Sequence, residues 1–237
     1  EIYFFAIFIG SPTFLTPSNS IPLIKRVVEA NKVLGLPTFI HAAESPAEKE
    51  FFQKHSGELW DFTKFIFPQL SLKKKYNNAV AYLFDHIENA QHFVLVHGNH
   101  IGEQELEQIV KQGITLIHCP KSYEFFGYPG TFPMGEYINR GLNISIGTDS
   151  MASNDSLNIW DELIHLRNTH QLSIDSLLPL ATRNGAIALN KEGEMGNIQK
   201  GFSADLQALS YSPSELNQLE KVEPIGVYFK GNKIYEN

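Results

Sequence analysis

Four residues that could bind a metal or move a proton follow short apolar runs of this chain. His41 and Glu44 close the run PTFIHAAE, His97 closes FVLVH, and Asp149 closes ISIGTD. Imidazole and carboxylate groups are preferred ligands of zinc and iron, and a catalytic metal keeps one position open for water. Because barrel enzymes assemble one site from the ends of separate strands, the four residues together predict the site of a metal-dependent hydrolase.

The residue types indicate different roles within such a site. His41 and Asp149 are the expected metal ligands, and the expected nucleophile is a metal-bound hydroxide formed near neutral pH. Glu44 would move a proton between that water and the leaving group, and His97 would orient the water or the substrate. Each residue alone also has a structural interpretation, as a hydrogen-bonded strand end, a solvated carboxylate or a turn cap. Their shared position after an apolar run favours catalysis.

The segments between these residues alternate between strand and helix patterns. Apolar runs predict strands that start near residues 2, 37, 92, 114 and 143. Amphipathic stretches between them predict helices. Repeated strand-helix units predict an α/β fold with a parallel sheet and right-handed crossovers.

Local signals predict several boundaries. Pro46 is suited to the first turn of a helix, and Ser156 could cap a helix that runs to about Asn168. The aromatic-rich segment 57–74 is expected to be irregular.

The last part of the chain has a different pattern. After helical turns, ADLQALS, IGVYFKG and NKIYEN predict short strands separated by turn residues. We therefore expect a barrel portion over residues 1–190 and a small β appendage over residues 191–237.

Composition narrows the range of partners. The formal net charge is -7 and the pI is about 5.7, which argues against general attraction to nucleic acid. The single Cys119 cannot form an intramolecular disulfide, so a reducing cytoplasm is the expected location. The apolar opening EIYFFAIFIG is too short to span a bilayer and lacks a basic leader region, so no membrane partner is expected.

A family resemblance appears at these same residues. The blocks HAAE, LVHG, HCPKS, GTDSMASN, ATRNGAIALN and GNIQKGFSADL resemble, in this order, those of the amidohydrolase superfamily, in its deaminase and chlorohydrolase branch. The resemblance covers most of the chain from about Pro37 to Ser210. It implies a TIM-type (β/α)8 barrel with a flanking β-sandwich and one divalent metal, zinc or alternatively iron.

The resemblance also implies roles for single residues. His41 resembles the metal-binding histidine after the fifth strand, and Glu44 resembles the proton-shuttling glutamate of an HxxE motif. His97 resembles the sixth-strand histidine that contacts the water and the substrate. Asp149 resembles the eighth-strand aspartate that binds the metal and acts as a base.

Two departures from the family pattern stand out. The first-strand HxH pair, which supplies two further metal ligands, occurs nowhere in this chain. If residues 2–9 form the fourth strand, the barrel lacks its first three strands and the appendage is only part of a sandwich. Thr13 stands where many relatives carry a substrate-contacting histidine. Residues 2–9 contain no lysine that could be carbamylated to bridge two metals, which favours one metal.

The resemblance implies hydrolytic deamination of an amino-substituted N-heterocycle, purine-like or nucleoside-like, with release of ammonia. The segment FFGYPGTFP resembles members that act on aminofutalosine. Two alternatives stay open: hydrolytic dechlorination of a heterocycle at the same site, and a metal-free fragment or binding module without turnover. The expected partners are a small heterocyclic substrate and a second copy of the chain in a homodimer.

Overall fold

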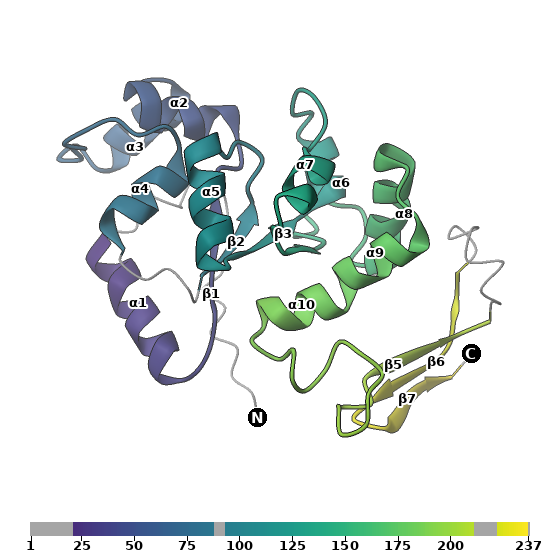
Figure 1. Ribbon diagram of the computed structural model, residues 1–237. Helices are drawn as coiled ribbons and strands as arrows, with labels where there is room; N and C mark the ends of the chain where they lie inside the picture. Colours follow the sequence, from purple (N-terminus) through teal and green to yellow (C-terminus); the bar gives the residue numbers. More distant parts are fainter. Residues whose placement is uncertain (1–20, 88–92, 211–221, 237) are drawn as a thin grey trace. The chain divides into compact units, whose positions relative to one another are not determined.

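The computed structural model describes residues 21–87, 93–210 and 222–236 (Figure 1). These residues form two compact units. The first unit holds the described residues through His118 together with Tyr128–Asn143, and the second holds Cys119–Gly127 with the described residues from Ile144 onward. The expected strand over residues 2–9 and the substitution at Thr13 lie outside the described residues.

Parallel strands form the centre of the first unit. They are β1 (Thr38–Ala42), β2 (Phe93–His97) and β3 (Thr115–His118), with β2 between the other two. Every residue of β2 is buried, as expected for a parallel strand covered on both faces. The predicted α/β class with a parallel sheet is confirmed here, and these strands begin within a residue or two of the predicted positions.

Helices make up most of the rest of this unit. They are α1 (Ile21–Val33), α2 (Pro46–Lys54), α3 (Glu58–Ile66), α4 (Ala79–His86), α5 (Glu103–Gln112) and α7 (Met134–Asn139). Helix α2 begins at Pro46, as predicted, and Ser45 caps it by accepting a hydrogen bond from the amide of Glu48 at 3.1 Å.

The expectation that residues 57–74 are irregular is wrong for the part that forms α3. The aromatic residues of this segment conceal its helical spacing, because they lie outside its buried face. Leu59 and Thr63, four residues apart, are the buried pair, while Phe62 and Phe65 are exposed. The hydroxyl of Thr63 donates to the carbonyl of Leu59 at 2.6 Å. Trp60 adds ring contacts to α2 and its cap, with centroids 5.0 Å from Phe51 and 4.8 Å from His55.

The second unit contains the last strand of the predicted alternation. It holds β4 (Ile144–Ile146) and the helices α6 (Pro120–Phe125), α8 (Ile159–His170), α9 (Ile174–Ala181) and α10 (Arg183–Ala188). The prediction that Ser156 caps α8 is wrong. Asn158 is the cap, and its side chain accepts from the amide of Trp160 at 3.1 Å. The hydroxyl of Ser156 instead accepts from the amide of Asn158, two residues before the helix.

A three-stranded antiparallel sheet forms the C-terminal part of the second unit, drawn in yellow and yellow-green in Figure 1. Its strands β5 (Leu206–Leu209), β6 (Pro224–Phe229) and β7 (Asn232–Glu236) follow one another in chain order. The turn between β6 and β7 consists of Lys230 and Gly231, both with positive φ, which suits a tight hairpin. The three short strands predicted for this region are confirmed. The boundary between residues 190 and 191 stays a prediction.

Among the residues that the structure describes, every helix is too short or too polar to cross a membrane.

Candidate metal and proton-transfer site

The two histidines lie at the carboxyl ends of neighbouring strands. His97 is the last residue of β2 and pairs in register with Ala42, the last residue of β1, while His41 pairs with Val96. The two imidazole rings are 5.0 Å apart between centroids. His97 is buried and His41 is half-buried. Parallel pairing therefore explains why residues 56 positions apart in the chain meet at one edge.

Glu44 follows β1 by two residues and faces His97. Its side chain is almost fully buried, and its Oε2 lies 3.7 Å from Nε2 of His97. The backbone of Glu44 is held on both sides. Its amide donates to Oε2 of Glu48 at 2.7 Å, and its carbonyl accepts from Nδ2 of Asn99 at 3.0 Å.

Glu48 lies directly behind this turn, in the first turn of α2. It is 1% exposed, and burial raises the pKa of its carboxyl from the ordinary 4.5 to about 7. The backbone amides of Glu44, Ala43 and Ser45 act in the opposite direction, because they stabilise the ionised form.

Asp149 follows β4 by three residues and is held through its side chain. Its Oδ2 accepts hydrogen bonds from the hydroxyls of Ser122, at 2.8 Å, and Ser153, at 2.6 Å. Both serines are buried. Two donors on one oxygen fix the orientation of the carboxylate and therefore also the direction of its other oxygen.

A buried glutamate also lies behind the Asp149 loop. Glu162 of α8 accepts from the amide of Lys121 at 3.0 Å and from Nδ2 of Asn154 at 2.6 Å. Asn154 in turn donates to the carbonyl of Thr148 at 2.7 Å. Burial raises the pKa of Glu162, and these donors lower it. The network ties the segments on either side of Asp149 to the start of α8.

The backbone is strained at three of these positions. Ala43, His97 and Asp149 have φ values of +55°, +73° and +55°, in the left-handed region that residues other than glycine rarely occupy. Each such residue costs about 1 to 3 kcal/mol, and strain of this kind is concentrated at functional sites. The strain lies where each strand turns into its loop, next to or at a reactive side chain.

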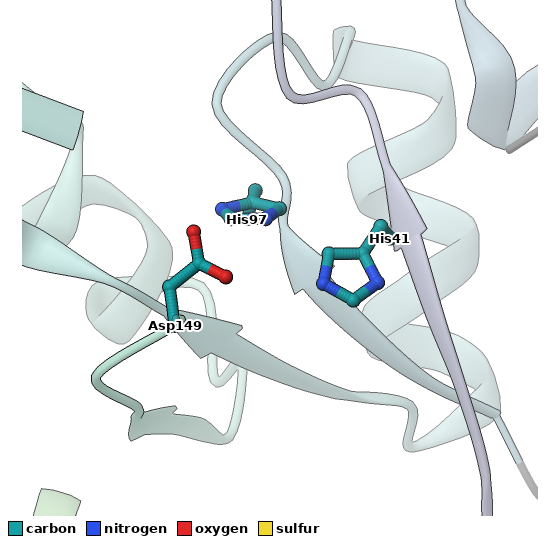
Figure 2. Close-up of side chains that lie close together, drawn as sticks. All are labelled: His41, His97 and Asp149. Carbon is teal, nitrogen blue, oxygen red and sulfur yellow. The ribbon is translucent and has the colours of Figure 1, made fainter. Parts of the chain in front are cut away.

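His41, His97 and Asp149 together form a group that could hold a metal ion (Figure 2). Each offers one ligand atom, and these atoms all lie within 4.8 Å of one another. Two imidazole nitrogens and one carboxylate oxygen suit zinc, and catalytic zinc sites use three protein ligands of this kind. The donor set therefore fits the divalent metal expected from the sequence, and it adds His97 as a third donor that the sequence analysis placed only beside the water.

Three supporting residues were not found from the sequence: Glu48, Ser122 and Ser153. Glu48 had a signal, because Ser45 and Glu48 form an S-x-x-E pattern typical of a helix start. Ser153 lies four residues after Asp149 but carries no distinguishing pattern. Ser122 lies 27 residues before Asp149, so only the fold brings it there.

Comparison with known proteins agrees with the resemblance noted in the sequence. The sequence profile described as "Amidohydrolase family" matches residues 13–234. Aminodeoxyfutalosine deaminase of Nitratiruptor is 29% identical over 225 residues, covering 89% of this chain and 53% of the relative. A 5-methylthioadenosine/S-adenosylhomocysteine deaminase of Thermococcus sibiricus is 26% identical, covering 84% of this chain and 53% of the relative. The chain thus spans about half the length of these curated relatives.

Solved structures share the fold at lower identity. Aminofutalosine deaminase of Helicobacter pylori, in complex with methylthio-coformycin, superposes with a TM-score of 0.75 at 22% identity, covering 90% of this chain and 54% of that one. The zinc complex of the atrazine chlorohydrolase TrzN of Arthrobacter aurescens gives 0.73 at 18% identity, covering 94% and 49%. Since the family profile matches nearly the whole chain, this protein belongs to the amidohydrolase family.

Proposed function

We propose that the protein of which this chain forms part hydrolyses an amino-substituted N-heterocycle, purine-like or nucleoside-like, and releases ammonia. The observation that carries the proposal is the grouping of His41, His97 and Asp149, with ligand atoms within 4.8 Å of one another and Glu44 beside His97. Water attacks the ring carbon that bears the amine, and the carbon–nitrogen bond breaks. The amine gains one proton from the water and leaves as ammonia, while the oxygen stays on the carbon and the other proton goes to the ring nitrogen.

The metal assignment follows from the donor set. His41 and Asp149 would hold one divalent ion, zinc or alternatively iron, with His97 beside them. When bound, such an ion supplies water of lowered pKa at neutral pH.

The protein side chains would then carry the protons. Asp149 is the base that accepts a proton from the attacking water, since its orientation is fixed by two hydroxyl donors. Glu44 delivers a proton to the departing amine nitrogen, because it is buried and its backbone is held on both sides. His97, which belongs to this group and lies beside Glu44, orients the water and the substrate.

The relatives support the substrate class and the wider architecture. The two deaminases named above are described as acting on aminodeoxyfutalosine and on 5-methylthioadenosine or S-adenosylhomocysteine. We therefore place an adenine-type ring first among the substrates of this chain. We also propose that its parallel sheet belongs to a (β/α)8 barrel with a β-sandwich, divided at residue 190. A cytoplasmic location and a homodimer are further proposals from the sequence.

A substrate screen tests the reaction. The complete zinc-loaded protein is incubated with aminopurines, adenosine-like nucleosides, aminopyrimidines and chlorinated triazines, and ammonia and chloride are both measured. We expect ammonia from an adenine-type substrate. Chloride from a triazine with no ammonia from any amine would instead support the second candidate, dechlorination at the same site.

Elemental analysis tests the metal site separately. We expect residues 1–237, expressed alone, to bind less zinc than the complete protein if the family's HxH ligands lie elsewhere, because fewer ligands lower metal affinity. Stoichiometric zinc or iron in this stretch would exclude a metal-free binding module. A complete protein without metal would contradict the proposed reaction.

A further inference from the structure

Glu48 is a buried carboxyl whose position the start of α2 does not require. Ser45 already caps the helix through its hydroxyl, and a glutamate at the third helical position can complete a capping box while remaining partly exposed. Here the side chain is 1% exposed. Its Oε2 reaches past the cap residue to the amide of Glu44, at 2.7 Å.

The turn that Glu48 contacts is held from the opposite side by the loop after β2. The amide of Gly98 donates to the carbonyl of Ala42 at 3.1 Å, and the amide of His100 donates to that of Ala43 at 2.9 Å. Asn99 donates through its side chain to the carbonyl of Glu44 at 3.0 Å. The loop after β2 therefore binds the carbonyls of this turn, and Glu48 accepts from its amide face.

This two-sided arrangement bears on a strained residue. Ala43 has a φ of +55°, which is unfavourable for alanine, and it lies directly before Glu44. Strain of this kind persists only where surrounding contacts hold it. Without an acceptor at Glu48, the peptide between Ala43 and Glu44 would lose the contact on its amide side and could rotate. The carboxylate of Glu44 would then move away from His97.

We propose that Glu48 is a positioning residue, which holds the Glu44 amide so that the Glu44 carboxylate stays 3.7 Å from His97. The inference rests on the proposed function, in which Glu44 transfers a proton. Glu48 acts through Glu44 and does not contact the substrate. Its loss therefore slows proton transfer without removing a metal ligand.

The test compares two substitutions of similar length in the complete zinc-loaded protein. Glu48→Met fills the buried space but has no acceptor for the amide, and Glu48→Gln keeps an acceptor oxygen. We expect Glu48→Met to lower kcat roughly 10 to 100-fold, the range found for residues that support a metal site, with KM and zinc content near wild type. Glu48→Gln should restore kcat to within about fivefold of wild type, since it keeps the hydrogen bond.

A control separates positioning from helix stability. Ser45→Ala removes the cap hydroxyl at the same helix start but leaves the Glu48 carboxylate in place. We expect it to lower Tm, at a cost of about 1 kcal/mol, with kcat changed by less than about twofold. If Ser45→Ala lowers kcat as much as Glu48→Met does, Glu48 serves only to cap the helix and the inference is wrong.

A second measurement does not depend on turnover. Hydrogen exchange at the Glu44 amide, followed by NMR or by mass spectrometry of its peptide, reports the bond to Glu48 directly. We expect faster exchange in Glu48→Met and protection in both Glu48→Gln and Ser45→Ala. Equal protection in wild type and Glu48→Met would overturn the inference. If the wild-type protein releases ammonia from no substrate, the proposed function fails, while this exchange result still decides the role of Glu48.

Discussion

The loop after β1 and the loop after β4 each carry a reactive carboxylate, but they hold it at different points. Glu44 is held through its backbone, with its amide on Glu48 and its carbonyl on Asn99. Asp149 is held through its own side chain, because two serine hydroxyls donate to its Oδ2. The loop after β1 thus fixes the backbone position of Glu44, whereas the loop after β4 fixes the orientation of the Asp149 carboxylate.

This difference matches the roles that we propose for the two groups. A metal ligand needs one oxygen in a set direction, and hydroxyl donors on the other oxygen provide that direction. A group that transfers a proton between water and a leaving amine must reach both of them. A side chain that is held only through its backbone suits this role.

Both loops have a buried glutamate from the following helix. Glu48 on α2 and Glu162 on α8 are each almost completely buried, and burial raises the pKa of both. Glu48 binds the amide of the reactive residue itself. Glu162 instead binds Lys121 and Asn154, which belong to segments beside Asp149. Because Glu162 does not bind Asp149 itself, the serine hydroxyls orient the Asp149 carboxylate.

The largest expected effect is that of Asp149→Asn. The substitution keeps the shape of the side chain but removes its charge and its ability to accept a proton, so we expect kcat to fall by roughly 10⁴-fold. Steady-state ammonia release and zinc content are the measurements. Asp155→Asn is the control, because Asp155 is exposed and pairs with Lys121 on the surface. Near-normal turnover in Asp149→Asn would refute its assignment as ligand and base.

Glu44→Gln should have the next largest effect. We expect zinc to be retained and kcat to fall by about 10² to 10³-fold, since the amide cannot exchange a proton but the backbone contacts remain. Glu50→Gln, at a half-buried position on α2, is the control and should leave kcat unchanged. Loss of zinc in Glu44→Gln would make Glu44 a metal ligand, and the contrast between the two loops would then be wrong.

The strand ends of the site could be predicted from the sequence, whereas its supporting contacts could not. A buried parallel strand is recognised by its apolar run, and the residue that follows the run must lie at the carboxyl edge of the sheet. This reasoning places His41 and His97 at the ends of β1 and β2, and Asp149 in the loop that follows β4. The hydroxyl of Ser122 reaches Asp149 from another segment, and no local pattern encodes that meeting.

The fold shows the same division between local and distant information. The start of α2 at Pro46 was predictable because proline and the serine before it act within one turn. Helix α3 was missed because exposed aromatic residues, Phe62 and Phe65, conceal the spacing of its buried residues. Ser156 was misassigned because serine and asparagine are both good caps, and Asn158 lies at the correct backbone position.

The pH dependence of stability tests whether Glu48 is as strongly buried as the structure indicates. Its pKa is raised from 4.5 to about 7 in the folded protein, so folding favours the protonated form. Stability from this group is complete below about pH 4.5 and is lost as the pH rises to about 7, by about 3 kcal/mol at most.

Glu48→Gln should remove this loss, because glutamine does not ionise. Urea unfolding at pH 5 and pH 8 should show a smaller decrease in unfolding free energy for the variant than for wild type. Because the two proteins share all other ionisable groups, the difference between their pH slopes isolates Glu48. Parallel slopes would mean that Glu48 ionises at an ordinary pKa and is less buried than described.

The smallest expected effects concern the two serines on Asp149. Ser153→Ala and Ser122→Ala should each lower kcat or zinc affinity by roughly tenfold, because either hydroxyl alone still orients Oδ2. Ser156→Ala is the control, since that hydroxyl binds the amide of Asn158. The double variant should lose more than the product of the single losses, because the two donors substitute for each other on one oxygen. If kcat and zinc affinity of the two single variants and the double variant stay within about twofold of wild type, the backbone alone positions Asp149. The two loops would then hold their carboxylates in the same way.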